Sequence, residues 1–502
     1  MLKVAFTVAL FAASSASAQL ISIRTVPVSQ AHQFEIFPSR TMSMGGVSIA
    51  VADELLDPFS NPASGARITT TRFFGSPSAY NVTSGAGGGR TLPVGALSKR
   101  ESWYGGVWLA LQEVDLNAQT DLSGIGPFCP ACSTLPDLDL GPVERTKGNT
   151  FAFAMAGKEL APGLSLGSSV LWSGLNAVDG VDLLYAGSAR INQSGNALDV
   201  RLGLMKEWAG ERTLEVIGLH NRFATSHDVY YLDSFWDPGT QQFSQRPRLE
   251  ENLDHTRTWG LHLAYDQPLS QPGWRAGSIF TFNRMDHPKL PNYQLASIQS
   301  IPRDPGNSSA FNIGFGLSRV LTKSTFGIDL VYEPIWSHTW DDAATPVQTV
   351  QGRTIPAGGR TIENRFRFSN AQARIGLDQE FYSVGPVMAL QLGLAVNNIH
   401  YWLEQHNHIQ NSDRSHEESW VEKTPTWGVS VRFPELEIRY HGSVTHGTGR
   451  PGVQPRGGWF VAEDRALTAS AGSNILAPPS GALSLTEVKV TTHRISISLP
   501  IH

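Results

Sequence analysis

The sequence repeats one unit several times. The unit is a strand of alternating apolar and polar residues, a tight turn and a second strand of the same kind. Residues 150–156 read TFAFAMA, turn through 159–163 and return as LSLGSSV over 164–170. The same unit recurs over 199–219 around a turn at 209–212. Strict alternation gives each strand two different faces. Short turns on one side and long polar loops on the other are typical of an antiparallel barrel that crosses an outer membrane.

The N-terminus has the features of an export signal. Lys3 precedes an apolar run over 4–13, and the small residues of 14–18 end in ASA, which fits a cleavage site. We therefore expect 1–18 to be a signal peptide and the mature chain to begin at Gln19. No later apolar run approaches the roughly 20 residues of a membrane-spanning helix. The exported chain is therefore either soluble or inserted as a closed sheet.

Composition narrows the function classes. The net charge is −5 and the sequence has no basic stripe, which argues against nucleic acid as a partner. The two cysteines, Cys129 and Cys132, form C-P-A-C in a proline-rich loop without the helix that a redox motif needs. In an oxidising compartment this spacing favours a local disulfide, with two free thiols as the alternative.

The alternation predicts sixteen strands, or fourteen if a weak first pair over 67–75 and 90–98 is not counted. An even number places both termini on the periplasmic side. The segment 19–66 lacks the repeat, so we expect the barrel to occupy 67–502. The other fourteen strands are expected at 103–112, 149–158, 164–174, 198–208, 213–223, 257–267, 274–284, 311–321, 325–336, 366–381, 386–402, 426–433, 435–446 and 490–501.

The connections sort by length. Short turns such as 209–212 and 270–273 are expected to face the periplasm, whereas long loops at 225–256, 338–364 and 403–423 are expected to face outside. A soluble β-sandwich, the alternative fold, has no reason to separate its loops in this way. The sequence therefore favours the transmembrane barrel, with outer-membrane lipid around it.

Charged residues on the strands fall on the polar parity. A charge facing lipid near the midplane costs roughly 2–4 kcal/mol for Arg or Lys, so these side chains should face the lumen. They are interpreted as ion networks that brace the wall around a plug, or as a solute-selectivity site. The set comprises Arg201, Asp329, Glu333, Arg374, Asp378, Arg432, Glu437, Arg439 and His441.

Tryptophans gather near strand ends, as expected for rings at the lipid head-group level. Those expected at the inner rim are Trp208 and Trp274. Those expected at the outer rim are Trp103, Trp336, Trp340, Trp402, Trp420 and Trp427.

One stretch before the first strand is distinctive. Residues 40–53 read RTMSMGGVSIAVAD, and N-P-A follows at Asn61, Pro62 and Ala63. This run resembles the N-terminal segment of the FadL/TodX long-chain fatty-acid transporter family and of related PorV-like outer-membrane proteins. The match covers 39–66, and elsewhere it consists of the general hairpin pattern.

The resemblance implies a fourteen-strand barrel that transports hydrophobic compounds. It also implies that 19–66 folds into the lumen as a hatch or plug. Asn61, Pro62 and Ala63 would lie in the hatch, with Met44, Gly45 and Gly46 beside the wall. The charged lumen makes the conduit less apolar than a fatty-acid channel, so the identity of the solute is not carried over.

No catalytic pattern is found. The chain has no Gly-x-Ser-x-Gly elbow, and the histidines at 406, 408 and 416 have no spacing typical of a metal site. We therefore expect no enzyme, no cofactor and no metal. The leading hypothesis is an outer-membrane barrel that admits small hydrophobic solutes. The alternative is a PorV-like barrel that transports nothing and docks surface or secreted proteins through its long loops.

Overall fold

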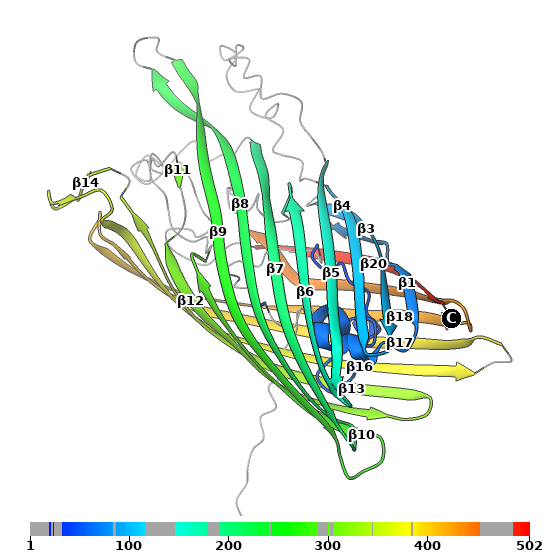
Figure 1. Ribbon diagram of the computed structural model, residues 1–502. Coiled ribbons are helices and arrows are strands. Elements are labelled where there is room, and N and C mark those ends of the chain that lie inside the picture. The colour runs from blue at the N-terminus through cyan, green and yellow to red at the C-terminus, as the bar shows by residue number, and fades with distance from the viewer. Residues whose placement is uncertain are drawn as a thin grey trace, which may run out of the picture.

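The computed structural model describes residues 20–21, 24, 33–83, 87–115, 146–178, 190–237, 239, 242–288, 300–301, 305–343, 345–382, 385–451 and 485–501. These residues form a closed antiparallel barrel of sixteen strands (Figure 1). Strand β1 (Thr71–Gly75) and strand β2 (Ser78–Val82) share the first position in the barrel. Both pair with β3 on one side and with β20 on the other, which closes the wall.

The remaining positions follow in chain order, each strand paired with the next. They are β3 (Gly88–Arg100), β4 (Trp103–Asp115), β5 (Thr146–Ala161), β6 (Leu164–Leu175), β7 (Arg190–Trp208), β8 (Arg212–Asp237), β9 (Gln242–Pro268), β10 (Trp274–Asp286), β12 (Gly306–Val320), β13 (Ser324–Asp342), β16 (Arg360–Tyr382), β17 (Val387–Asn407), β18 (Ser412–Arg432), β19 (Glu437–Pro451) and β20 (Leu485–Ile501). Three two-residue strands are added outside this order: β11 (Ser300–Ile301) beside β9, and the pair β14 (Val347–Gln348) and β15 (Thr354–Ile355).

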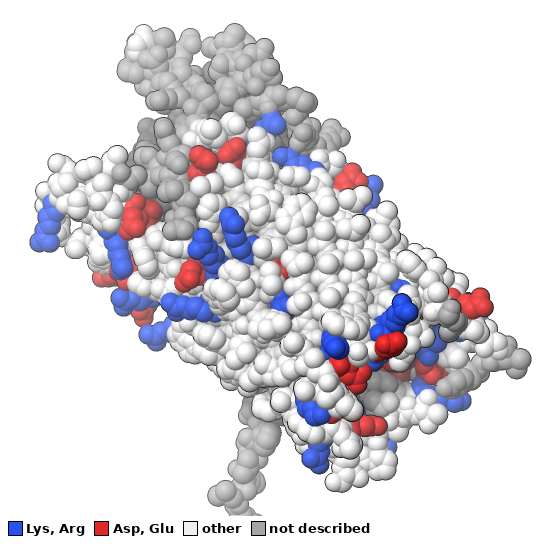
Figure 2. All heavy atoms as spheres, in the orientation of Figure 1, with Lys and Arg blue, Asp and Glu red and all other residues white. Residues whose placement is uncertain are grey.

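The alternation of each strand separates a lipid face from a lumenal face. Leu109, Phe315 and Leu330 point outward and are 58%, 64% and 52% exposed, whereas the residues beside them in sequence are buried or half-buried. Figure 2 shows charged side chains toward both ends of the visible face and a charge-poor band between them. A broad apolar band between charged rims is the surface of a transmembrane barrel.

Within the described residues, no helix is long and apolar enough to cross a membrane.

The strand count corrects one expectation. The family resemblance implies fourteen strands, but the first pair is present and the barrel has sixteen. The first strand begins at Thr71 rather than residue 67, because Pro62–Arg67 forms a 3-10 helix, η2. The expected signal peptide at 1–18 and the cysteine pair Cys129 and Cys132 lie outside the described residues.

Three expected outer loops are largely strand. Strands β8 and β9 stay paired out to Asp237 and Gln242, and β17 and β18 stay paired out to Asn407 and Ser412. Strand β16 begins at Arg360, inside the loop expected at 338–364. Beyond the membrane both faces of a strand can carry polar residues, which hides the alternation that marks a strand inside it. The barrel therefore extends well past the lipid on its loop side (Figure 1).

Residues 33–67 run through the interior of the barrel (Figure 1). This N-terminal segment contains a 3-10 turn, η1 (Met42–Met44), a single helical turn, α1 (Asp57–Ser60), and η2 (Pro62–Arg67). The first contacts β16 to β19, and the last contacts β3 to β7. The segment thus meets the wall on both sides of the lumen.

Candidate functional site: the lumen and its N-terminal segment

Asp53 holds the first half of the N-terminal segment in shape. Its carboxylate accepts hydrogen bonds from Ser39 Oγ (2.6 Å), the Arg40 amide (2.7 Å) and the Thr41 amide (3.1 Å). The other carboxylate oxygen accepts from the amides of Leu55 and Leu56, both at 3.1 Å. Because the carboxylate is almost fully buried, these bonds replace the water that it loses. Asp53 therefore closes residues 39–56 into one loop.

The turn at Met44, Gly45 and Gly46 lies directly against the wall. Gly45 has φ of 70°, and its amide donates to Thr426 Oγ at 2.9 Å. A Cβ added at Gly393 of β17 would lie 2.1 Å from the Gly45 nitrogen. The two backbones can approach this closely only because the wall residue has no side chain. This is the contact that the family resemblance places beside the wall.

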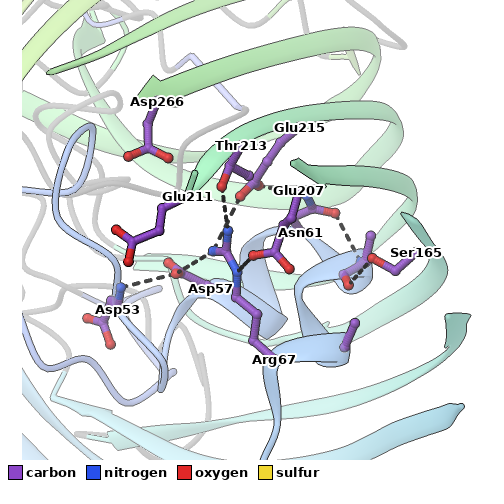
Figure 3. Close-up of polar contacts among 12 residues, drawn as sticks. Asp53, Asp57, Asn61, Arg67, Ser165, Glu207, Glu211, Thr213, Glu215 and Asp266 are labelled. Atoms are coloured by element: carbon purple, nitrogen blue, oxygen red, sulfur yellow. Dashed lines mark hydrogen bonds and ion pairs between the residues drawn. The ribbon is translucent and has the colours of Figure 1, made fainter. Parts of the chain in front are cut away.

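The Asn61-Pro62-Ala63 turn lies beside Glu215 and Ser165, near the short turn that joins β7 to β8 (Figure 3). The Asn61 side-chain oxygen accepts from the Ala63 amide at 3.0 Å, and its amide group donates to Glu215 at 2.7 Å. Ser165 Oγ donates to the Ala63 carbonyl at 3.1 Å. Asn61 is 1% exposed and Ala63 is fully buried. The turn is thus fixed to β6 and β8.

Arg67 adds ion pairs at the same place (Figure 3). Its guanidinium lies 2.8 Å from Glu207, 3.7 Å from Glu215 and 3.9 Å from Asp57. The pKa of Asp57 is raised well above its usual value, first because the carboxyl is removed from water and then because Asp53 and Glu215 repel a second charge; Arg67 opposes the shift. Acidic groups therefore outnumber the arginine that holds the segment here.

Three charged wall residues bind the segment through its backbone. Asp329 accepts from the amides of Ser48 (2.7 Å) and Ile49 (3.2 Å). Arg374 donates to the Gly46 carbonyl at 3.1 Å, and it lies 4.0 Å from Asp329. On the opposite side Arg201 donates to the Ser60 carbonyl at 3.1 Å. These side chains hold the segment against the wall.

A second group on β19 also contacts the segment. Glu437 pairs with Arg40 at 3.2 Å and with its strand neighbour Arg439. His441 Nδ1 and Ser43 Oγ form a 2.9 Å hydrogen bond. These three wall residues face the lumen and are less than a tenth exposed. They lie beside the η1 end of the segment.

The other three expected lumenal residues connect strands instead. Glu333 hydrogen-bonds to Gln372 on the neighbouring β16. Asp378 accepts from Gln391 of β17. Arg432 pairs with Glu380 at 3.5 Å and with Glu437 at 3.6 Å, and it keeps 43% of its side chain exposed. Of the nine charged residues, seven therefore contact the segment or pair with a residue that does, and Glu333 and Asp378 bond within the wall.

Two apolar clusters inside the barrel have no counterpart among the expectations from the sequence. In one, Phe37 stacks on Phe59 with centroids 4.6 Å apart, and both lie against Trp108 and Phe153 of the wall. On β5 the phenylalanines face inward while Ala152 and Ala154 face lipid. Either face could have met lipid, so the alternation alone could not decide.

The second cluster lies on the loop-side half of β10 to β18, and it includes Ile335, Phe366, Tyr401 and Trp420. Trp420 is therefore buried inside the barrel, not in the outer girdle as expected. The outer-rim positions expected for Trp103 and Trp427 are also wrong. Both residues lie toward the short-turn ends of β4 and β18. Trp336 and Trp402 do face outward and are exposed.

A cavity of about 610 Å³ lies in the wall where β1 and β2 meet. Its lining includes the lipid-facing Leu92, Leu111 and Ile495 together with the lumen-facing Gln112 and Arg494. The cavity is therefore lined by both faces of the wall.

Two prolines explain why the wall is weak here. Pro77 separates β1 from β2, and Pro93 lies in β3 opposite Ser76. Neither has an N–H, so each removes one hydrogen bond from the ladder. The register is unchanged across the break, since Gly75 pairs with Ile497 and Ser78 pairs with Arg494. The break therefore thins the hydrogen bonding without opening the barrel.

The N-terminal segment is hydrogen-bonded to two lumen-facing residues of this cavity. Arg494 donates to the Phe37 carbonyl at 2.7 Å and also to the Glu35 carbonyl. Gln112 donates to the Gln33 carbonyl at 2.7 Å. Residues 33–37 are therefore fastened to two of the side chains that line the cavity. A movement of residues 33–37 would therefore change the contacts on the lumenal side of the cavity.

No family model matches the chain, and no curated protein matches it. Among solved structures, the chain is similar to a FadL homologue from Pseudomonas aeruginosa, with a TM-score of 0.44 and 12% identity over 93% of this chain and 99% of that one. It is also similar to the toluene transporter TodX from Pseudomonas putida, with a TM-score of 0.41 and 9% identity over 92% and 98%. The ferric enterobactin receptor from Pseudomonas aeruginosa matches with a TM-score of 0.33 and 10% identity over 86% and 81%. At these scores the similarity assigns no function to this chain.

Proposed function

We propose that the chain is a FadL/TodX-like outer-membrane barrel that passes small hydrophobic solutes, with the wall cavity beside Pro77 as the exit and the N-terminal segment as the gate. The observation that carries the proposal is the cavity itself. It is lined by residues from both faces of the wall, and two of its lumen-facing residues, Gln112 and Arg494, hydrogen-bond to residues 33–37. The motif shared with that family lies in the same segment.

The solute class follows from the lining. Three outward-facing residues of the cavity, Leu92, Leu111 and Ile495, are aliphatic and continue the apolar outer surface, while the exposed Arg90–Glu113 pair lies on its loop side. A hydrophobic molecule that left the lumen here would meet the aliphatic part of the wall. A sugar or an ion would gain nothing from this route, because it would lose its hydration in lipid.

The entry side is argued from the inner cluster of Phe366, Tyr401 and their neighbours. These side chains form a buried apolar cluster on the loop-side half of the barrel, whose packing a solute would have to enter. In this mechanism a solute adsorbs there, the segment loosens from Arg494 and Gln112, and the solute passes into the wall cavity. The charged groups around the segment hold the closed state.

Uptake of a labelled monoaromatic hydrocarbon by cells tests the proposal. Ser78 lies in the cavity lining, so Ser78→Trp should fill the exit and slow uptake several-fold. Ala154→Trp on the lipid face of β5 is the matched control and should leave uptake unchanged. Uptake that is equal in cells with and without the gene would refute transport. If a surface protein were lost from cells lacking the gene as well, the PorV-like role would replace it.

A further inference from the structure

A group of arginines faces outward from the loop-side half of β8 to β10. Arg222 of β8 and Arg257 of β9 are direct cross-strand neighbours, and both side chains are exposed. Arg284 of β10 is one pleat nearer the periplasm, opposite Trp259. Figure 2 shows basic side chains gathered over β8 and β9, on the loop side of the charge-poor band. We name Arg222, Arg257 and Arg284 the arginine patch.

The charges of the arginine patch are not balanced by the protein. Like charges directly opposite each other destabilise a sheet. Among the described residues, the guanidinium groups of Arg222 and Arg257 take part in no hydrogen bond or ion pair. The guanidinium of Arg284 donates to Ser309 Oγ at 3.2 Å. One acidic residue, Asp286, lies opposite Arg257. Three positive charges against one negative leave the patch cationic.

The arginine patch lies at the level of the lipid head groups. Trp259 is 60% exposed on the outer face, and the His220 ring lies against it with centroids 4.1 Å apart. Trp336 of β13 is a second exposed tryptophan on the loop-side half of the wall, 51% exposed. Exposed tryptophans toward the loop-side ends of these strands mark the interface between hydrocarbon and head groups. Arg222 and Arg257 lie one pleat further out.

We propose that the arginine patch binds the phosphate groups of a phosphorylated glycolipid of the lipid A type in the outer leaflet. Directly opposed residues have Cβ atoms about 5 Å apart, so both guanidinium groups can reach one phosphate. Guanidinium donates two parallel hydrogen bonds to phosphate, which makes arginine the preferred residue for such a group. The acyl chains of the same lipid would then lie along the apolar wall beneath Trp259.

Lipid binding to the purified full-length barrel in a non-ionic detergent tests this proposal. The probes are bisphosphorylated lipid A, its monophosphorylated form and phosphatidylcholine, with dissociation constants measured by native mass spectrometry. A basic residue near an anionic surface contributes about fivefold in affinity. The double variant Arg222→Gln with Arg257→Gln should therefore bind bisphosphorylated lipid A roughly 25-fold more weakly, and added salt should weaken wild-type binding.

Arg319→Gln is the matched control, because this exposed arginine lies near the periplasmic end of β12 and contacts Trp274. It should bind like wild type. Equal binding of lipid A by the double variant and wild type would overturn the proposal, as would equal wild-type affinity for phosphatidylcholine. Displacement of the lipid by the same concentration of inorganic phosphate would reject a lipid site, and unchanged lipid binding with loss of a co-purified protein would make the patch a protein interface. The measurement is independent of solute uptake.

Discussion

In the proposed mechanism, Arg494 is the residue on which gating depends most directly. It lies in the cavity lining and donates to the carbonyls of Phe37 and Glu35. Arg494→Met keeps the length of the side chain but removes every donor. Residues 33–37 should then detach more often, and uptake of the labelled hydrocarbon should rise several-fold. Initial uptake rates at matched expression levels give the measurement.

Arg72→Met provides the comparison for Arg494→Met. Arg72 is an arginine of β1, close to the same junction of β1 and β2, and its guanidinium donates to the nearby Thr70 at 3.3 Å. Uptake should not change in this variant. If Arg494→Met left uptake at the wild-type rate while the barrel still folded, residues 33–37 would not be the gate.

Asp57 predicts a dependence of stability on pH. Its pKa in the folded protein is raised by burial and by Asp53 and Glu215. The folded state therefore binds a proton that the unfolded state has released, and stability falls as pH rises from the usual aspartate value toward the raised one. Asp57→Asn should flatten this fall and give a higher unfolding temperature than wild type at the alkaline end. Thermal unfolding followed across this pH range measures it.

Asp53→Asn is the contrasting variant for Asp57→Asn. An amide can accept on only one of its two polar atoms, whereas the Asp53 carboxylate accepts on both oxygens. Asp53→Asn should therefore lower the unfolding temperature at every pH tested. A steeper pH dependence in Asp57→Asn than in wild type would contradict the assignment.

At the scale of elements, the interruption between β1 and β2 is a backbone property. Pro77 has no N–H to donate toward β20, although its carbonyl accepts from Ile495 at 3.0 Å. Pro77→Val should restore a ladder bond worth about 1 kcal/mol and narrow the cavity. We expect slower uptake together with equal or higher thermal stability.

Pro334→Val on β13 is the control for the junction of β1 and β2. This proline also interrupts a ladder, because the pairing of β12 with β13 stops at Ala310 and resumes at Ile313. It lies away from the cavity, so uptake should stay unchanged. Equal slowing of uptake by both variants would show that a general stiffening of the wall, rather than the junction of β1 and β2, limits passage.

The elements inside the membrane could be predicted from the sequence, and those beyond it could not. Lipid on one side imposes a strict alternation, which is why the pair at 67–75 and 90–98 was detectable and proved to belong to the barrel. In the paired stretch that begins at Thr225, the buried face carries the polar Thr225 and His227 beside Val229, so burial does not produce an alternation of apolar and polar residues. In the same way, β5 has an apolar lumenal face because the N-terminal segment covers it with Phe37 and Phe59. Tertiary contact, and not the strand itself, decided which face is which.

At the scale of the whole molecule, the segment and the wall are complementary in shape as well as charge. Glycines on several strands create the room that the segment occupies. Gly277 and Gly316 face Ile49, and Gly376 faces Met44, at distances that leave no space for a side chain. These glycines belong to one run of neighbouring strands, whereas η2 contacts β3 to β7, so the full contact surface exists only when both parts of the wall are assembled. The segment is thus fitted to the assembled barrel.

The long β8–β9 hairpin gives the last prediction, because it separates the barrel from its outer extension. Tyr230 pairs with Leu249, and the pairing continues to Asp237 and Gln242. Strand β11 pairs with β9 at Glu251, inside this point. Removing 231–248 and joining the two ends by Asn-Gly, which forms a tight hairpin turn, should leave the membrane-spanning ladder intact. The shortened protein should insert, unfold within a few degrees of wild type and take up hydrocarbon at the wild-type rate.

The docking alternative predicts a different result for the same truncation. If the outer extension served to hold a surface protein, that protein would be released while uptake in cells stayed at the level of cells lacking the gene. Surface proteomics and hydrocarbon uptake on the same cultures therefore decide between the two roles. An intact Arg222–Arg257 pair lies below the cut, so lipid A binding should survive in either case. Loss of uptake, lipid binding and insertion together would instead mean that the hairpin is needed for folding. Among the described residues, the hairpin beyond Tyr230 pairs within itself and with β11, and this limited pairing argues against such a need.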